Sequence, residues 1–120
     1  SGIMHQEMPS GNAKGQMHGF QLWANLPGSL KMTSPRYQDV GAKEIPEMID
    51  DDGTQVRVIT GSFWGQTGPV DGIAADPLYL DVSVPAGRRK ALKVDTYRNS
   101  FAYIFEGSGK YADASDPQGV

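Results

Sequence analysis

The chain has 120 residues, of which 38% are apolar and 21% are charged, and its formal net charge is −3. This composition is typical of a soluble globular domain, and the acidic balance excludes the basic surface that nucleic-acid binding requires. Cysteine is absent, which excludes disulfides, thiolate metal sites and a cysteine nucleophile, and favours a cytoplasmic location; no apolar run approaches the ~20 residues of a membrane helix.

Alternation of apolar and polar residues with a period of two recurs along the chain and predicts an all-β protein. In chain order, we predict strands at residues 3–8, 19–24, 37–40, 55–60, 78–84 and 100–106. The clearest alternation lies in residues 78–84, where Leu80 and Val82 are expected to face a core and Asp81 to face solvent. Residues 100–106 are apolar on both faces and are expected to be covered on both sides.

Glycine- and proline-rich stretches separate these strands and predict turns. They lie at residues 9–15, 25–29, 50–53, 65–72 and 107–109. Residues 31–52 have the weakest periodicity and are interpreted as a long strap with a domain boundary inside it. Two half-domains, residues 1–48 and 49–120, are therefore expected.

His5 and Glu7 lie two residues apart in the first predicted strand and should project from the same face. Imidazole and carboxylate are ligand types of non-haem iron sites, so the pair is a candidate metal site. A surface pair or a buried hydrogen-bonded pair is the commoner outcome for such a spacing. Two ligands also leave a site incomplete, because at least one further donor is needed.

The remaining chemical motifs favour structural roles. His18, the second of two histidines, is expected to donate to a backbone carbonyl at the start of a strand, with direct metal ligation as the less common alternative. Residues 50–53 lack the spaced ligands of a calcium loop and predict a hairpin turn with Gly53 at positive φ. Residues 106–110 do not meet the spacing of a phosphate loop. Trp23 and Trp64 are expected in the core, with a ligand pocket as the alternative.

Several blocks of sequence resemble the pirin family. The most specific are residues 2–9, Gly-Ile-Met-His-Gln-Glu-Met-Pro, and residues 18–26, His-Gly-Phe-Gln-Leu-Trp-Ala-Asn-Leu. Weaker blocks follow in the same order as in the family: residues 31–32, 35–38, 44–46, 56–61, 78–81 and 100–107. The resemblance thus extends over nearly the whole chain.

The resemblance implies a bicupin, in which two jelly-roll β-barrels are stacked in one chain and the first holds iron. In the family three histidines and a glutamate bind the metal, and by this match His5 and Glu7 are two of the four ligands. The upstream His-x-His pair has no counterpart in this sequence. We therefore expect an internal fragment: residues 1–48 end the first, metal-binding cupin with its strap, and residues 49–120 begin the second, metal-free cupin.

The resemblance implies Fe(II)/Fe(III) in a full-length parent with activity of the quercetin 2,3-dioxygenase type on a flavonol-like small molecule. Glu7 would then also act as a catalytic base. The alternative is an iron- or redox-responsive regulatory module that contacts a protein partner without turnover. The fragment alone is expected to be inactive, to lack tightly bound iron and to self-associate, because an incomplete barrel exposes edges and apolar faces. Neither nucleic acid nor membrane is an expected partner.

Overall fold

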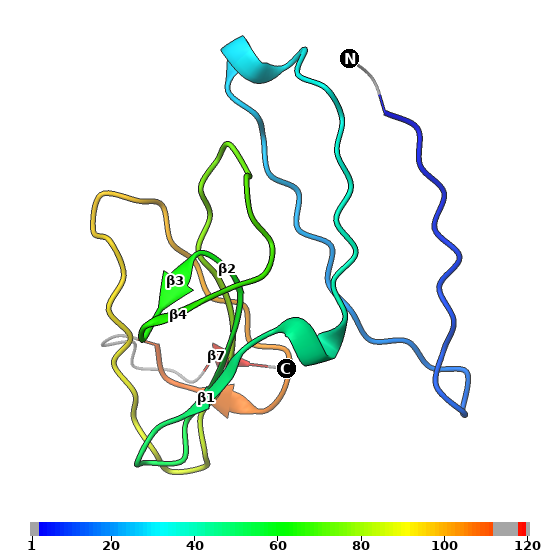
Figure 1. Cartoon of the computed structure of the whole chain (residues 1–120). Helices are drawn as coiled ribbons and strands as arrows, with labels where there is room; N and C mark the ends of the chain where they lie inside the picture. Colours follow the sequence, from blue (N-terminus) through cyan, green and yellow to red (C-terminus); the bar gives the residue numbers. More distant parts are fainter. Residues whose placement is uncertain (1–2, 112–117, 120) are drawn as a thin grey trace. The chain divides into compact units, whose positions relative to one another are not determined.

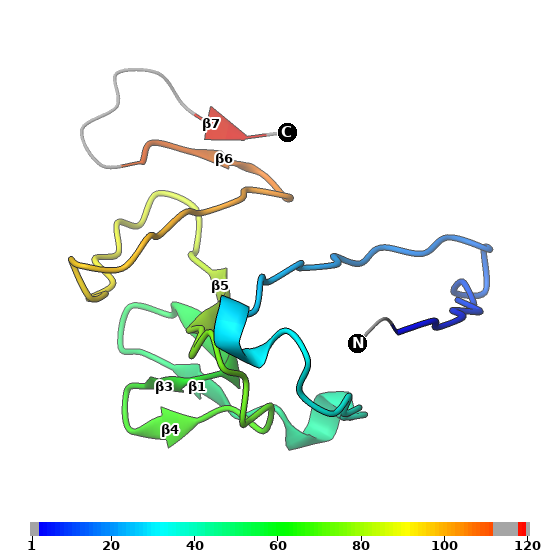
Figure 2. The same ribbon diagram turned by 90° about the horizontal axis from the view of Figure 1, so that it is seen from above.

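The computed structural model describes residues 3–111 and 118–119 and contains two compact units, Ser1–Arg89 and Lys90–Val120. Regular structure in the described residues consists of short antiparallel strands and two 3-10 turns, with no α-helix among them (Figures 1 and 2). The all-β class is thus confirmed, whereas a closed barrel is not seen in the described residues. The predicted boundary between residues 48 and 49 stays a prediction.

A three-stranded antiparallel sheet in the order β1-β2-β5 forms the centre of the first unit. It contains β1 (Glu47–Ile49), β2 (Gln55–Thr60) and β5 (Tyr79–Ser83). The predicted strands at residues 55–60 and 78–84 are confirmed, because β2 and β5 occupy them. In the β2–β5 ladder Val56 lies opposite Val82, and Val58 lies opposite Leu80. Period-two alternation therefore places these valines and leucine together on one face.

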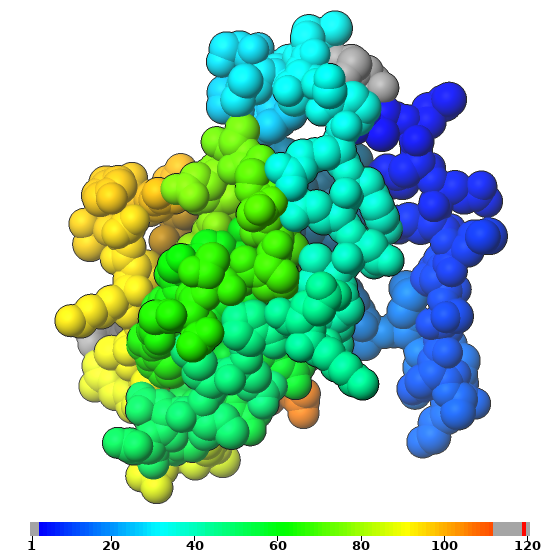
Figure 3. Space-filling view, viewed as in Figure 1, coloured from blue at the N-terminus to red at the C-terminus, as the bar shows by residue number. Residues whose placement is uncertain are grey.

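The core of this unit lies on that face of β2. Val56 and Val58 are fully buried, and Phe63 is 7% exposed. In Figure 3 the green residues, which include β1, β2 and the adjoining β3–β4 region, form one continuous group. Buried Thr60 satisfies its hydroxyl by donating from Oγ1 to the carbonyl oxygen of Val70 at 2.8 Å. The core is small, so each of its side chains contributes a large share of the apolar surface that the unit buries.

Two tight hairpins shape the sheet region. Between β1 and β2 the amide of Gly53 (φ +83°) donates to the carbonyl of Asp50, which confirms the turn predicted there. The second hairpin pairs β3 (Ser62–Phe63) with β4 (Gln66–Thr67) through Trp64 and Gly65, whose φ values are 45° and 77°. Positive φ at both central residues is the requirement of a type I′ turn. The glycine-rich stretch predicted only as a turn therefore contains a strand.

The first 46 residues contain no strand within the part that the structure describes, so the strands predicted at residues 3–8, 19–24 and 37–40 are wrong as regular elements. The segment holds a turn in which the amide of Asn12 donates to the carbonyl of Gln16, and the two 3-10 turns η1 (Gly28–Leu30) and η2 (Ala42–Glu44). Alternation makes a segment suitable for a sheet, but a strand also needs a backbone ladder.

Side chains attach the strap to the loop between β4 and β5. Arg36 Nη2 lies 2.8 Å from Asp71 Oδ1. The amide of Gln38 donates from Nε2 to the Asp71 carbonyl at 2.9 Å and accepts from the Asp71 amide at 3.2 Å. Gln38 thus pairs with a peptide unit as a neighbouring strand would.

The second unit contains the two-residue strands β6 (Ser108–Gly109) and β7 (Gln118–Gly119), which pair antiparallel. The strand predicted at residues 100–106 is not found, and that prediction is wrong. Phe101 is 79% exposed and Tyr103 is 67% exposed, so the expected cover on both sides is absent from the described residues. No helix in the described part of the chain is long or apolar enough to cross a membrane.

Candidate functional site

His5 and Glu7 lie on the extended segment before the turn at residues 12–16, and their side chains converge. The distance from His5 Nε2 to Glu7 Oε1 is 3.9 Å, and the side chains are 62% and 66% exposed. The same-face projection expected from their spacing is therefore present without a sheet around it. Their assignment as metal ligands stays a prediction.

Glu7 has a second partner from the far side of the turn. Gln21 Nε2 donates to Glu7 Oε1 at 3.0 Å, and Trp23 Nε1 donates to Gln21 Oε1 at 3.1 Å. Four side chains, two from each extended segment, thus form one polar cluster: His5, Glu7, Gln21 and Trp23. Sequence reasoning missed Gln21 and Trp23 as members of the site. Their own spacing of two residues, placed after a tight turn, was the signal available.

Imidazole and carboxylate, the donor groups of His5 and Glu7, are of the types that suit a first-row metal. With bonds of about 2.0–2.2 Å, two donors in neighbouring positions around one ion lie about 3.0–3.5 Å apart. The observed separation of 3.9 Å is longer, so the two exposed side chains would have to move closer together to share an ion. Among the described residues, however, no group of three or more histidine, cysteine, aspartate or glutamate side chains could hold a metal. In the described residues His5 and Glu7 would therefore supply at most two donors to a metal.

The other predicted features have structural surroundings. The His18 ring packs on Phe20 with centroids 5.5 Å apart and an interplanar angle of 56°, and its expected bond to a carbonyl stays a prediction. Gly107 (φ +74°) leads into β6, as a glycine turn would. The expectation that both tryptophans lie in the core is wrong, because Trp23 is 82% exposed and Trp64 is 41% exposed.

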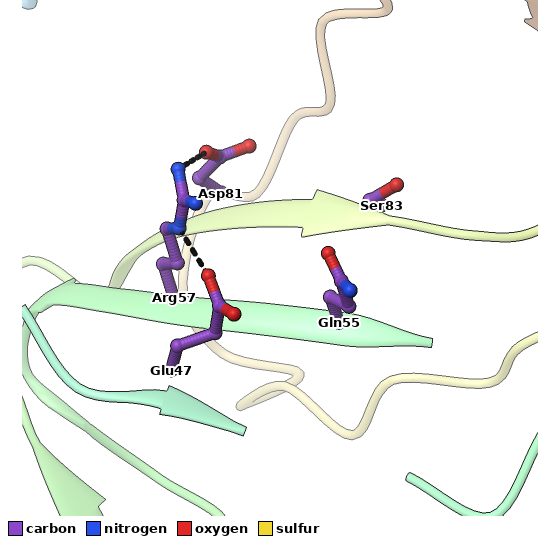
Figure 4. Close-up of a pocket in the computed structure, with 5 residues that line it drawn as sticks. All are labelled: Glu47, Gln55, Arg57, Asp81 and Ser83. Atoms are coloured by element: carbon purple, nitrogen blue, oxygen red, sulfur yellow. Dashed lines mark hydrogen bonds and ion pairs between the residues drawn. The ribbon is translucent and has the colours of Figure 1, made fainter. Parts of the chain in front are cut away.

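A second polar cluster lies on the solvent face of the sheet, around Arg57 of β2 (Figure 4). Arg57 Nε lies 2.6 Å from Glu47 Oε2 on β1, and Arg57 Nη1 lies 3.8 Å from Asp81 Oδ2 on β5. The hydrogen bond to Glu47, and then its charge, raise the pKa of the Arg57 guanidinium above its ordinary value. The three residues, with Gln55 and Ser83, line a shallow pocket.

This second cluster joins strands. Glu47 and Asp81 are the direct cross-strand partners of Arg57 in the two ladders. Both carboxylates face the permanently charged guanidinium of Arg57, so the pairing of neighbouring strands accounts for all three charged side chains. We therefore treat His5 and Glu7 as the candidate site.

Comparison with curated proteins identifies relatives over most of the chain. It is 44% identical over 112 residues to a pirin-like protein of Caulobacter vibrioides and 36% identical over 115 residues to a pirin-like protein of Arabidopsis thaliana. It is 37% identical over 111 residues to a Pseudomonas aeruginosa protein named "Putative quercetin 2,3-dioxygenase". These matches cover 92%, 94% and 89% of this chain.

The chain spans about two fifths of the length of these relatives, namely 40%, 36% and 39%. No family model matches the chain, and no solved structure matches it. Each match covers most of this chain. This chain is therefore a homologue of the pirin family.

Proposed function

We propose that this chain forms part of a non-haem iron protein of cupin fold, with His5 and Glu7 as two protein ligands of the metal. The observation that carries the proposal is the approach of His5 Nε2 to Glu7 Oε1 at 3.9 Å. Imidazole and carboxylate are donors that suit iron, and both side chains are exposed, so a rotation of either can bring the two donors onto one ion. Kinship with pirin-like proteins supports the same assignment.

The activity we propose for the full-length protein is of the quercetin 2,3-dioxygenase type. The name of the Pseudomonas aeruginosa relative supports this reaction class. Iron, when bound, supplies the Lewis-acid and redox chemistry that a flavonol and dioxygen require. His5 would hold the iron through Nε2, and Glu7 would hold it through a carboxylate oxygen. The carboxylate of Glu7 would also accept the proton of a flavonol hydroxyl brought within hydrogen-bond reach.

We also propose that the chain contains parts of two cupin domains, residues 1–48 and 49–120. The antiparallel β1-β2-β5 sheet and the absence of α-helix in the described residues support an all-β domain of this kind. In this arrangement His5 and Glu7 belong to the first, metal-binding cupin. The Arg57 cluster belongs to the second cupin, where it joins strands.

The test of this function uses the full-length protein loaded with Fe(II) under anaerobic conditions. On admission of air, quercetin loss and oxygen uptake should proceed together. Glu7→Gln should reduce both, whereas Glu44→Gln, which alters an exposed carboxylate elsewhere in the unit, should not. Absence of both signals with iron bound would contradict the enzymatic function and favour the regulatory alternative.

The 120-residue chain should bind Fe(II) weakly or not at all, because its described residues offer two donors in one place. Titration with Fe(II) under argon, followed by gel filtration and iron analysis, measures this. Tight, stoichiometric iron in this chain would show that further donors, such as those of a second copy, complete the site.

A further inference from the structure

In the polar cluster around Glu7, the donor and the acceptor of each hydrogen bond follow from the chemistry of the side chains. The indole Nε1–H of Trp23 can only donate, so the atom of Gln21 that faces it must be the amide oxygen. The amide nitrogen of Gln21 then necessarily faces the other way, toward Glu7 Oε1 at 3.0 Å. An ionised carboxylate only accepts hydrogen bonds, so this orientation is the one that satisfies all three groups.

The same oxygen of Glu7 faces both Gln21 and His5. Oε1 accepts from Gln21 Nε2 and lies 3.9 Å from His5 Nε2. A carboxylate oxygen has two lone-pair directions, so a bond from Gln21 leaves one for a ligand on the His5 side. An exposed glutamate without such a partner would sample several rotamers, and ordering it would weaken binding of any ion. The bond from Gln21 removes part of that cost beforehand.

We propose that Gln21 is a positioning residue that holds the carboxylate of Glu7 beside His5, and that Trp23 fixes the orientation of the Gln21 amide. The inference rests on the proposed function, because the carboxylate it orients is the proposed iron ligand. Residues that hydrogen-bond to metal ligands set the orientation of those ligands, and their loss typically lowers metal affinity about 10- to 100-fold. Gln21 and Trp23 act through Glu7 and are not ligands themselves.

The first experiment needs no metal. In the isotopically labelled 120-residue chain, the side-chain amide resonances of Gln21 report the bond to Glu7 and the bond from Trp23. Glu7→Gln and Trp23→Phe should each shift these resonances, whereas Trp64→Phe should leave them unchanged. Gln21 resonances that are insensitive to both changes would overturn the inference, whatever the protein does with iron.

The second experiment measures Fe(II) affinity of the full-length protein by anaerobic competition with a chelator. Gln21→Leu should weaken binding about 10- to 100-fold, and Trp23→Phe should weaken it less. Gln6→Leu is the matched control. It makes the same change at a residue that lies between His5 and Glu7 in the sequence but projects from the opposite face of the segment. It should leave the affinity unchanged.

A spectroscopic readout separates positioning from general damage. The electron paramagnetic resonance spectrum of the Fe(II)–nitrosyl form should change with Gln21→Leu and not with Gln6→Leu. If the wild type binds iron and Gln21→Leu has the same affinity and the same spectrum, the inference is overturned and the proposed function stays intact. Wild type that binds no iron would overturn the proposed function and the positioning role together.

Discussion

Arg57 and Glu47 join β2 to β1 through a contact of 2.6 Å between Nε and Oε2, directly across the antiparallel ladder. Both residues are partly exposed, so the pair is screened by solvent and its contribution to stability is small. Its importance lies in register, because a slip of one residue would turn Arg57 toward the core.

Arg57→Met should accelerate hydrogen exchange of the β2 backbone amides, and the acceleration should disappear in 1 M NaCl. The salt dependence follows because added ions screen the attraction between exposed charges. Because the pKa of Arg57 is raised in the folded state, its contribution is fully present below the ordinary pKa of arginine and is lost only as the pH rises through the folded-state pKa, so the arginine adds no pH dependence near neutrality. Arg89→Met is the control. An acceleration of β2 hydrogen exchange that persists in 1 M NaCl would contradict the electrostatic account.

Val58→Ala should destabilise the sheet by about 1–3 kcal/mol, because it removes two methyl groups from a fully buried site and leaves a cavity. Val84→Ala makes the same change at a residue that is 41% exposed and should cost much less. Urea unfolding or hydrogen exchange of β2 measures both. Equal losses at the two positions would show that the core does not lie where the structure places it.

Local sequence pattern predicted two of the three strands of the central sheet. Alternation located β2 and β5, and Gly53 predicted the turn between β1 and β2. The strand β1 was missed, because residues 47–49 lie in the strap, where the periodicity is weak. Pattern failed at residues 3–8, 19–24 and 100–106, which alternate or are apolar but have no backbone ladder in the described structure. Alternation of apolar and polar residues indicates that a segment can join a sheet, but it does not indicate whether a partner strand is present.

The candidate site was predicted in part for a related reason. Spacing of two residues on an extended segment was enough to bring His5 and Glu7 to one face. The approach of Gln21 to Glu7 depends on the turn at residues 12–16, which brings the two segments opposite each other. That alignment is a property of the turn's geometry and is not encoded in either segment alone. The exposure of Trp23 likewise depends on what packs around its segment.

The 120-residue chain should self-associate. Large apolar side chains of its first segments are exposed, among them Met4 at 101%, Met8 at 85% and Trp23 at 82%. Exposed apolar surface on this scale is a typical cause of association. Sedimentation velocity over a tenfold or greater concentration range should show dimers or larger species, and Phe20→Ser with Leu22→Ser should reduce them. A concentration-independent monomer with a sharp thermal transition would contradict this expectation.

The central claim is that His5 and Glu7 hold iron, and the most direct test is Fe(II) affinity of the full-length protein with single ligand changes. His5→Ala and Glu7→Ala should each weaken binding by more than about 100-fold, beyond the effect expected of a residue that only positions a ligand. His18→Ala removes the second of the two histidines in this sequence and should leave affinity unchanged. Wild-type affinity in His5→Ala, or an equal loss in His18→Ala, would contradict the assignment.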